Sequence, residues 1–227
     1  KMKQETILEK RRRQSDRIRQ MTVAAMLSAI TALLVFTPIG MIQLPPPLLA
    51  VTTVHVPVLI AALVEGWWVG GFVGLVFGVC SLIRAWESGA VGLTLFFRNP
   101  LISVLPRILF PLGAYAVYLL LKKLFRDGQV LDKIAAGIAA AVGAILNTVL
   151  VLGTLYLIYG AKLTELVNNM ISAGNAEAHY LDHAGAWLVA AVGLPNGIAE
   201  AVVAAILVPM VKVAVDAVTK RKGRKQA

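Results

Sequence analysis

The sequence has few charged residues for its length. Asp, Glu, Lys and Arg make up 15% of its 227 residues, and apolar residues make up 58%. Soluble domains have about 25% charged residues. Cys80 is the only cysteine, which excludes an internal disulfide. No polar stretch is long enough for a soluble lobe and no Walker A sequence occurs, so a nucleotide-binding domain is excluded. These absences indicate a multi-pass membrane protein.

Motifs of intramembrane enzymes are absent as well. The chain has no His-Glu-x-x-His sequence for a metalloprotease and no Gly-x-Ser sequence for a rhomboid-like serine protease. His179 and His183 are four residues apart with Asp182 between them, but two histidines in a polar segment are weak support for a metal site. We therefore expect no enzymatic activity, no metal and no cofactor.

Six apolar segments predict an all-α integral membrane protein with six transmembrane helices. The segments cover about residues 21–36, 52–64, 67–83, 100–121, 134–159 and 187–211. The second follows a proline-rich stretch at Pro45–Pro47 and contains Pro57. Its thirteen residues would reach only about 20 Å as a helix, against a hydrocarbon core of about 30 Å. The second span should therefore be short, or it should use part of the preceding loop at membrane depth.

The basic residues are concentrated outside the apolar segments. The net charge is +10, and the bases gather in an arm at residues 1–20, in the turn after residue 121 and in a tail at residues 212–227. Six spans would put all three on one side, and the positive-inside rule makes that side the cytosol. We expect a transmembrane domain at residues 21–211, cytosolic termini and contact with anionic lipid, with no nucleic-acid partner.

A few polar side chains lie inside the apolar segments. Arg107, Asn147, Asn196 and Glu200 come from three different spans, between mid-membrane and the outer face. An ionisable group in a bilayer costs about 3 kcal/mol on insertion scales. Each group has a structural interpretation: a snorkelling anchor for the arginine, or hydrogen bonds between packed helices for the others. Together they favour a small-molecule site, because convergent polar groups in an apolar pocket are what such a site needs.

The first span carries a stripe of small residues. Ala25 and Ala29 are one helical turn apart, and Ala32 continues the stripe. A flat face of this kind lets another helix approach closely. The stripe predicts either packing within this chain or docking to another membrane subunit.

The sequence resembles the substrate-binding S components of energy-coupling factor (ECF) transporters, and the similarity covers nearly all of residues 21–211. It looks closest to the pantothenate-type branch, which also holds members for other substrates. The segments that carry it are Arg19-Gln-Met-Thr-Val-Ala-Ala-Met-Leu-Ser-Ala, Thr53-Val-His-Val-Pro-Val-Leu-Ile-Ala-Ala, Gly70-Gly-Phe-Val-Gly-Leu-Val-Phe-Gly, Asn99-Pro-Leu-Ile-Ser-Val-Leu-Pro-Arg, Gly143-Ala-Ile-Leu-Asn-Thr and Leu194-Pro-Asn-Gly-Ile-Ala-Glu.

The resemblance implies a vitamin-binding subunit of a prokaryotic cell-membrane importer. Ala25 and Ala29 match the family's docking pattern for a membrane coupling subunit, which two ABC ATPases drive. Pantothenate is the leading substrate, with riboflavin, cobalamin or another vitamin as alternatives. A standalone secondary carrier or channel is the rival class. The resemblance places these residues in the substrate site: Arg98, Asn99, Arg107, Asn147, Asn196 and Glu200.

Overall fold

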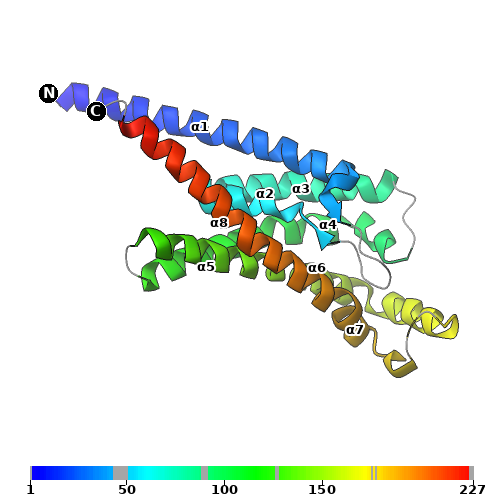
Figure 1. Ribbon diagram of the computed structural model, residues 1–227. Coiled ribbons are helices and arrows are strands. Elements are labelled where there is room, and N and C mark those ends of the chain that lie inside the picture. The colour runs from blue at the N-terminus through cyan, green and yellow to red at the C-terminus, as the bar shows by residue number, and fades with distance from the viewer. Residues whose placement is uncertain are drawn as a thin grey trace.

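The computed structural model describes residues 2–42, 51–87, 92–125, 128–174, 176 and 178–224 (Figure 1). The expected proline-rich loop at Pro45–Pro47 lies outside these residues. Apart from short turns and connections, the described chain is helical, with two strands of two residues each that pair antiparallel with Met41 opposite Thr52. The α-helices are α1 (Met2–Phe36), α2 (His55–Ile60), α3 (Trp67–Glu87), α4 (Pro100–Ser103), α5 (Leu105–Leu124), α6 (Gln129–Ser172), α7 (Ala184–Trp187) and α8 (Leu194–Arg224).

Shorter elements connect or extend these helices. They are the 3-10 helices η1 (Pro38–Gly40), η3 (Gly92–Arg98) and η4 (Ala178–Tyr180), the strands β1 (Met41–Ile42) and β2 (Val51–Thr52), and the π-helical turns η2 (Ala61–Glu65) and η5 (Leu188–Gly193). The turn η2 continues α2, and η5 joins α7 to α8. The expected basic arm at residues 1–20 is the first part of α1, which runs without a break into the first apolar segment.

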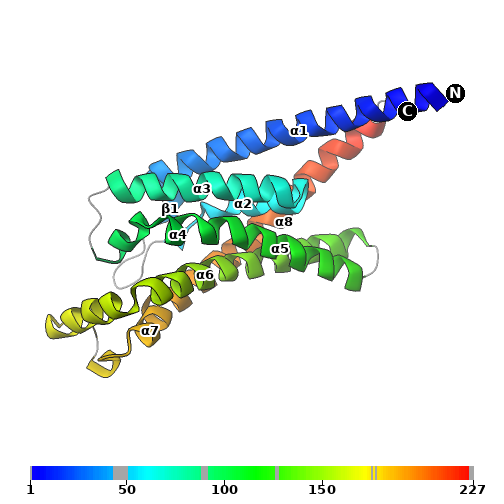
Figure 2. The ribbon, with the colours of Figure 1, turned by 180° about the vertical axis from the view of Figure 1, so that it is seen from behind.

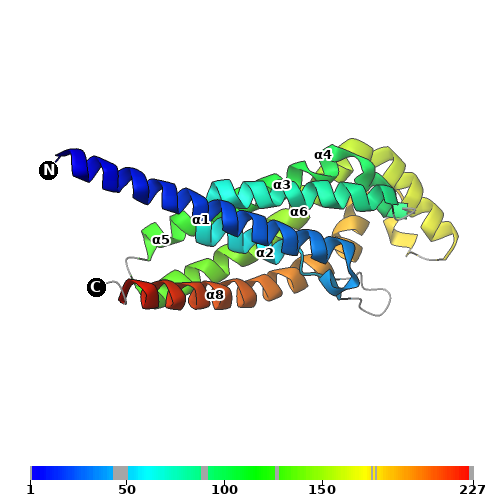
Figure 3. The same cartoon turned by 90° about the horizontal axis from the view of Figure 1, so that it is seen from above.

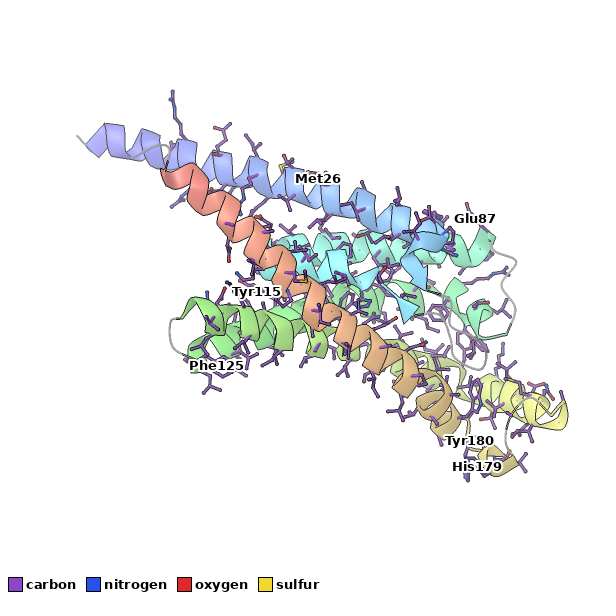
Figure 4. All side chains as sticks on the ribbon, viewed as in Figure 1. Met26, Glu87, Tyr115, Phe125, His179 and Tyr180 are labelled. Atoms are coloured by element: carbon purple, nitrogen blue, oxygen red, sulfur yellow. The ribbon has the colours of Figure 1, made fainter. Side chains whose placement is uncertain are left out.

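Six helical segments run alternately between the two ends of an elongated bundle: α1, α2 with η2, α3, α5, α6 and α8. The start of α1 and the end of α8 lie at the same end, which we call the terminus end (Figures 1, 2 and 3). Phe125 lies toward that end, whereas Glu87, His179 and Tyr180 lie toward the other, which we call the far end (Figure 4). Arg19 also joins Glu65 at the terminus end, with an N–O distance of 2.7 Å. This even number of passes agrees with the predicted arrangement.

Five of these segments are long and apolar enough to cross a membrane: 13–36, 67–87, 100–124, 130–172 and 184–217. The remaining one, His55–Glu65, is apolar but has only eleven residues, which would span about 16 Å as a regular helix. The all-helical fold with several helices that could cross a membrane is therefore confirmed, and the second segment is short as predicted. The count of six membrane spans stays a prediction.

The outward surface of the bundle is rich in large apolar side chains, as a lipid-facing surface should be. Leu120, Leu157 and Ile198 are examples that are more than half exposed. The interior holds small and branched residues, including Val58, Ala139 and Ala204, all with no exposed surface. The bundle therefore has an apolar outer surface, which suits contact with lipid, and a closely packed interior.

Glycine sets the distance between α3 and α5, as the Gly74-x3-Gly78 spacing predicts. A Cβ at Gly74 would collide with the backbone oxygen of Arg107, and a Cβ at Gly78 would lie 2.7 Å from the Cα of Val104. Only residues without a side chain allow this approach. Gly74 and Gly78 thus bring the first turn of α5 against α3 and fix the position of Arg107.

A cluster of charged groups joins α5, α6 and α8 at the terminus end. The Asp132 carboxylate on α6 accepts a hydrogen bond from the Tyr118 hydroxyl at 2.6 Å and lies 2.9 Å from the Lys212 ammonium. Lys122 is 3.7 Å from the same carboxylate, and Asp216 is 3.6 Å from Lys212. Lys212 is buried. The polar groups of this cluster satisfy one another and bind the three helices together.

Candidate functional site

A cavity of about 320 Å³ opens in the far half of the bundle. It lies among α1, α3, α5, α6, α8 and strand β2. Its volume is at the small end of the range for ligand sites, about 300–1,000 Å³. Its lining residues are Val35, Thr52, Val54, Phe77, Ser81, Arg84, Ala85, Thr94, Phe97, Arg107, Asn147, Thr148, Val151, Leu152, Val192, Asn196 and Glu200.

Helical periodicity explains how residues that are several positions apart in the sequence line the same cavity. Phe77, Ser81 and Arg84 lie on one face of α3 because they are spaced by four and three residues. Val192, Asn196 and Glu200 are spaced by four along η5 and α8 in the same way. The cavity therefore collects polar groups from several apolar helices.

Arg107 is the most deeply placed cation of the cavity. Its residue is 7% exposed, and its Nη1 donates a hydrogen bond of 2.6 Å to the backbone oxygen of Ile102. The guanidinium carbon lies 5.6 Å from the ring centre of Phe77 and 5.3 Å from that of Phe97, within range of cation–π attraction. Its Nε is buried without a hydrogen-bond partner. No carboxylate of the described chain lies within 4.0 Å, so the guanidinium can still accept an anionic group.

Glu200 is the acidic residue among those that line the cavity. Its Oε1 accepts hydrogen bonds from the backbone nitrogen of Thr52 at 3.2 Å and from the Thr52 hydroxyl at 2.6 Å. Its Oε2 lies 3.9 Å from Nδ1 of His55, which is fully buried. The carboxylate also attracts the Arg107 guanidinium electrostatically. Glu200 therefore joins α8 to strand β2 and gives the cavity a hydrogen-bond acceptor.

The two asparagines differ in burial. Asn147 on α6 is buried, and its Oδ1 has no hydrogen-bond partner. Asn196, one turn before Glu200, is partly buried. Leaving a buried polar atom unpaired costs about 1–3 kcal/mol. The Asn147 amide oxygen is thus a ready acceptor for a ligand donor.

The lining residues carry charges of both signs. Arg84 and Arg107 are cationic, and Glu200 is anionic. The cavity is also enclosed by apolar residues such as Val151 and Val192, and a low-dielectric surrounding strengthens each of these charges. The site is suited to a small anion that also carries hydrogen-bonding groups.

Of the six predicted site residues, the structure brings four together in this cavity: Arg107, Asn147, Asn196 and Glu200. Arg98 and Asn99 are not among the lining residues. Arg98 donates to the backbone oxygen of Ala85 at 3.1 Å and lies over the Trp86 ring. Asn99 caps α4 by accepting from Leu101 N at 3.0 Å, and its amide donates to the Tyr159 hydroxyl at 3.2 Å. Their predicted contact with a ligand stays a prediction.

Five polar lining residues were not predicted: Thr52, Ser81, Arg84, Thr94 and Thr148. Arg84 lies just beyond the apolar segment predicted at residues 67–83, although its spacing of three and seven residues from Ser81 and Phe77 puts all three on one helical face. Thr52 carries no such signal, because its role depends on Glu200, which is 148 residues away in the sequence. Only the folded chain shows that contact.

Ala25 and Ala29 lie away from the cavity. Both are exposed on α1, whereas Ala24 beside them is buried. Met26 also lies on this helix and is 61% exposed (Figure 4). The Ala25–Ala29 surface is therefore not covered by any helix of the described chain.

His179 and Asp182 of the polar segment contact aromatic and amide side chains. Within the described residues, no group of three or more His, Cys, Asp or Glu side chains could hold a metal ion. The His179 ring instead contacts Tyr180 (Figure 4), and Asp182 exchanges hydrogen bonds with Asn168.

Comparison with known proteins gives two matches. The model of the family "ECF transporter, substrate-specific component" matches residues 19–212. The pantothenic acid transporter PanT of Lactococcus lactis subsp. cremoris (strain MG1363) is 30% identical over 137 residues. That alignment covers 54% of this chain and 64% of PanT, so the match spans a little under two thirds of the relative.

Proposed function

The chain belongs to the family of ECF transporter substrate-specific components, and we propose that it binds pantothenate in the cavity around Arg107. Proteins of this family serve transport rather than catalysis, and they work with a small-molecule substrate and a membrane-embedded energy-coupling module. The similarity to a pantothenic acid transporter supports the choice of substrate.

The observation that carries the proposal is the incompletely paired Arg107 guanidinium on the wall of the cavity. A carboxylate placed against it would form charge-assisted hydrogen bonds and would use the buried Nε. Pantothenate has a carboxylate at one end, hydroxyl groups at the other and an amide between them. The hydroxyl and amide groups match the acceptors Glu200 and Asn147.

Other vitamins fit this wall less well. Riboflavin would need aromatic surfaces for its large ring, but Trp86 and Trp187 are not lining residues. The aromatic residues that do line the cavity, Phe77 and Phe97, are both occupied by the Arg107 guanidinium. A slender, anionic, hydroxylated ligand uses the polar groups present.

We further propose that both termini are cytosolic and that the far half of the bundle faces outward. The cations Lys122, Lys123 and Lys212 lie at the terminus end with the basic arm, as the positive-inside rule requires. The cavity then captures substrate from outside the prokaryotic cell. The exposed Ala25–Ala29 surface docks to the coupling subunit, and two ABC ATPases drive delivery inward.

The substrate is tested by direct binding. The chain is purified in detergent, the co-purifying small molecule is identified by mass spectrometry, and pantothenate and riboflavin are titrated by calorimetry. We expect pantothenate to co-purify and to bind with one-to-one stoichiometry. Tight binding of riboflavin or cobalamin, with none of pantothenate, would reassign the substrate while keeping the family.

The transport role is tested in proteoliposomes. Uptake is measured for the chain alone and together with the coupling subunit, both ATPases and ATP. We expect uptake only with the full module. Ala29→Leu should leave binding intact and abolish uptake, because added bulk on a close helix contact prevents docking. Full uptake by the isolated chain would identify a secondary carrier or channel instead.

Orientation is tested by cysteine labelling. Ser172 is exposed at the far end and Lys10 is exposed on the basic arm. In a Cys80→Ser background, an impermeant thiol reagent should label Ser172→Cys in intact cells and should label Lys10→Cys only after lysis. The reverse pattern would invert the proposed topology.

A further inference from the structure

A second groove lies between α6 and α8, toward the terminus end. It has a volume of about 550 Å³ and shares no lining residue with the candidate cavity. No residue of α1 lines it, so it is also separate from the Ala25–Ala29 surface. Its lining consists of one lysine and eight apolar residues: Lys133, Ile134, Gly137, Ile138, Ala141, Val142, Ile145, Ala205 and Pro209.

Small residues make this groove, and large ones border it. A Cβ at Gly137 would lie 3.2 Å from both the backbone oxygen of Ala205 and Cγ of Pro209, so the two helices cross closely there. Ile134 and Ile145 are each 47% exposed and face outward. The groove is therefore apolar and open along the lipid-facing surface of the bundle.

The length of the groove matches one leaflet of a membrane. Twelve residues separate Lys133 from Ile145, which corresponds to about 18 Å along a helix. Half of a hydrocarbon core is about 15 Å. The groove thus begins near the membrane surface at the terminus end and ends near the middle of the membrane.

Lys133 gives the surface end of the groove a positive charge. The neighbouring Asp132 does not neutralise it, because the Asp132 carboxylate is engaged by Tyr118 and Lys212 between the helices. Among the residues that the structure describes, no carboxylate forms an ion pair with Lys133. A lysine side chain therefore lies at the membrane-surface end of an apolar groove that is about as long as one leaflet is thick.

We propose that this groove binds one acyl chain of an anionic phospholipid and that the Lys133 ammonium contacts the lipid phosphate. The apolar lining and its length fit the chain, and the charge of Lys133 complements the headgroup. Attraction between one such lysine and an anionic leaflet corresponds to about a fivefold preference over a neutral lipid. The site does not depend on which substrate the other cavity binds.

Native mass spectrometry of the full chain released from detergent tests this site. Phosphatidylglycerol and phosphatidylcholine with identical acyl chains are titrated separately. We expect one phosphatidylglycerol to be retained, with about fivefold weaker retention in Lys133→Gln. Lys123→Gln is the matched control, because Lys123 is an exposed lysine at the same end that does not line the groove.

A second variant tests the groove itself. Ala141→Phe fills it and should reduce retention of both lipids, whereas Ala116→Phe on the exposed face of α5 should not. Thermal unfolding of each variant checks that the chain is folded, and Lys133→Gln tests the headgroup contact without added bulk. Equal retention of the two lipids, or equal losses in Lys133→Gln and Lys123→Gln, would overturn the proposal. So would crosslinking of Ile138→Cys to the coupling subunit, which would make the groove a protein contact.

Discussion

The two halves of the bundle each receive a buried or partly buried polar group from α5, α6 and α8, but they use these groups differently. At the terminus end, Tyr118, Asp132 and Lys212 contact one another at 2.6 and 2.9 Å. In the far half, Arg107, Asn147 and Glu200 surround a cavity of about 320 Å³. The same three helices thus close at one end and separate around a space at the other.

The difference lies in which polar atoms find partners inside the protein. Buried polar groups are nearly always hydrogen-bonded in native structures, so exceptions indicate a missing ligand or a functional role. Asp132 has three partners, whereas Nε of Arg107 and Oδ1 of Asn147 have none. The polar groups at the terminus end therefore join the helices, whereas the far half has buried polar atoms that are open to the proposed ligand. Variants in each half separate these two roles.

Arg107→Ala should have the largest effect. Removing the partner of a buried anionic ligand typically costs about 2–5 kcal/mol of binding free energy. Arg107→Lys should also bind weakly, because lysine keeps the charge but loses the planar fork. Calorimetric titration with pantothenate measures both. Arg98→Ala, measured beside them, tests the second arginine predicted to bind the substrate, which does not line the cavity. Unchanged affinity in a folded Arg107→Ala protein would reduce Arg107 to a structural anchor.

Lys212→Met should destabilise the fold without changing ligand affinity. It leaves the Asp132 carboxylate with fewer partners in a partly buried position, and breaking a buried ion pair costs about 3–5 kcal/mol. We expect the lower end of that range because Tyr118 and Lys122 remain. Thermal or denaturant unfolding in detergent measures the loss. The double variant with Asp132→Leu should recover part of the stability. A loss of ligand affinity without a loss of stability would contradict a purely structural role for the terminus end.

Gly74→Ala should affect both fold and binding. The new methyl group collides with the backbone oxygen of Arg107, and overpacking of this kind costs about 1–3 kcal/mol. It also displaces the first turn of α5, so affinity should fall with stability. Gly153→Ala on α6 is the control, because a Cβ there meets no atom within 4 Å. A stable Gly74→Ala protein with normal affinity would show that α3 does not position Arg107.

The sequence predicts the helices better than it predicts the contacts between them. Long apolar segments and basic flanks locate α1, α3, α5, α6 and α8, because lipid selects such segments strongly. The short passage through α2 and η2 was also predicted from its length. Its continuation as a π-helical turn was not, since hydropathy carries no information on hydrogen-bond register.

For the candidate site, too, the sequence identifies the unusual residues better than the contacts that they make. Arg107 and Glu200 stand out because a charged residue in an apolar segment is unusual. The resemblance also places Arg98 and Asn99 in the site, and that stays a prediction; in the structure their polar atoms contact Ala85, Leu101 and Tyr159. A sequence shows which residues are polar but does not show which of them already have partners. That distinction decides between a structural and a ligand-binding role.

Two asparagines test that distinction with the smallest expected effects. Asn147 has an unpaired buried oxygen, whereas Asn99 caps α4 and bonds to Tyr159. Leucine has the same number and branching of side-chain heavy atoms as asparagine, so Asn147→Leu should raise the free energy of unfolding by about 1 kcal/mol, because an unsatisfied group is removed. Asn99→Leu should lower it by about 1 kcal/mol through loss of the cap. Unfolding of the ligand-free proteins measures both. Asn147→Leu should weaken pantothenate binding as well, since the ligand loses an acceptor. If both variants lose stability equally, the Asn147 oxygen has a partner in the free protein and is not reserved for the ligand.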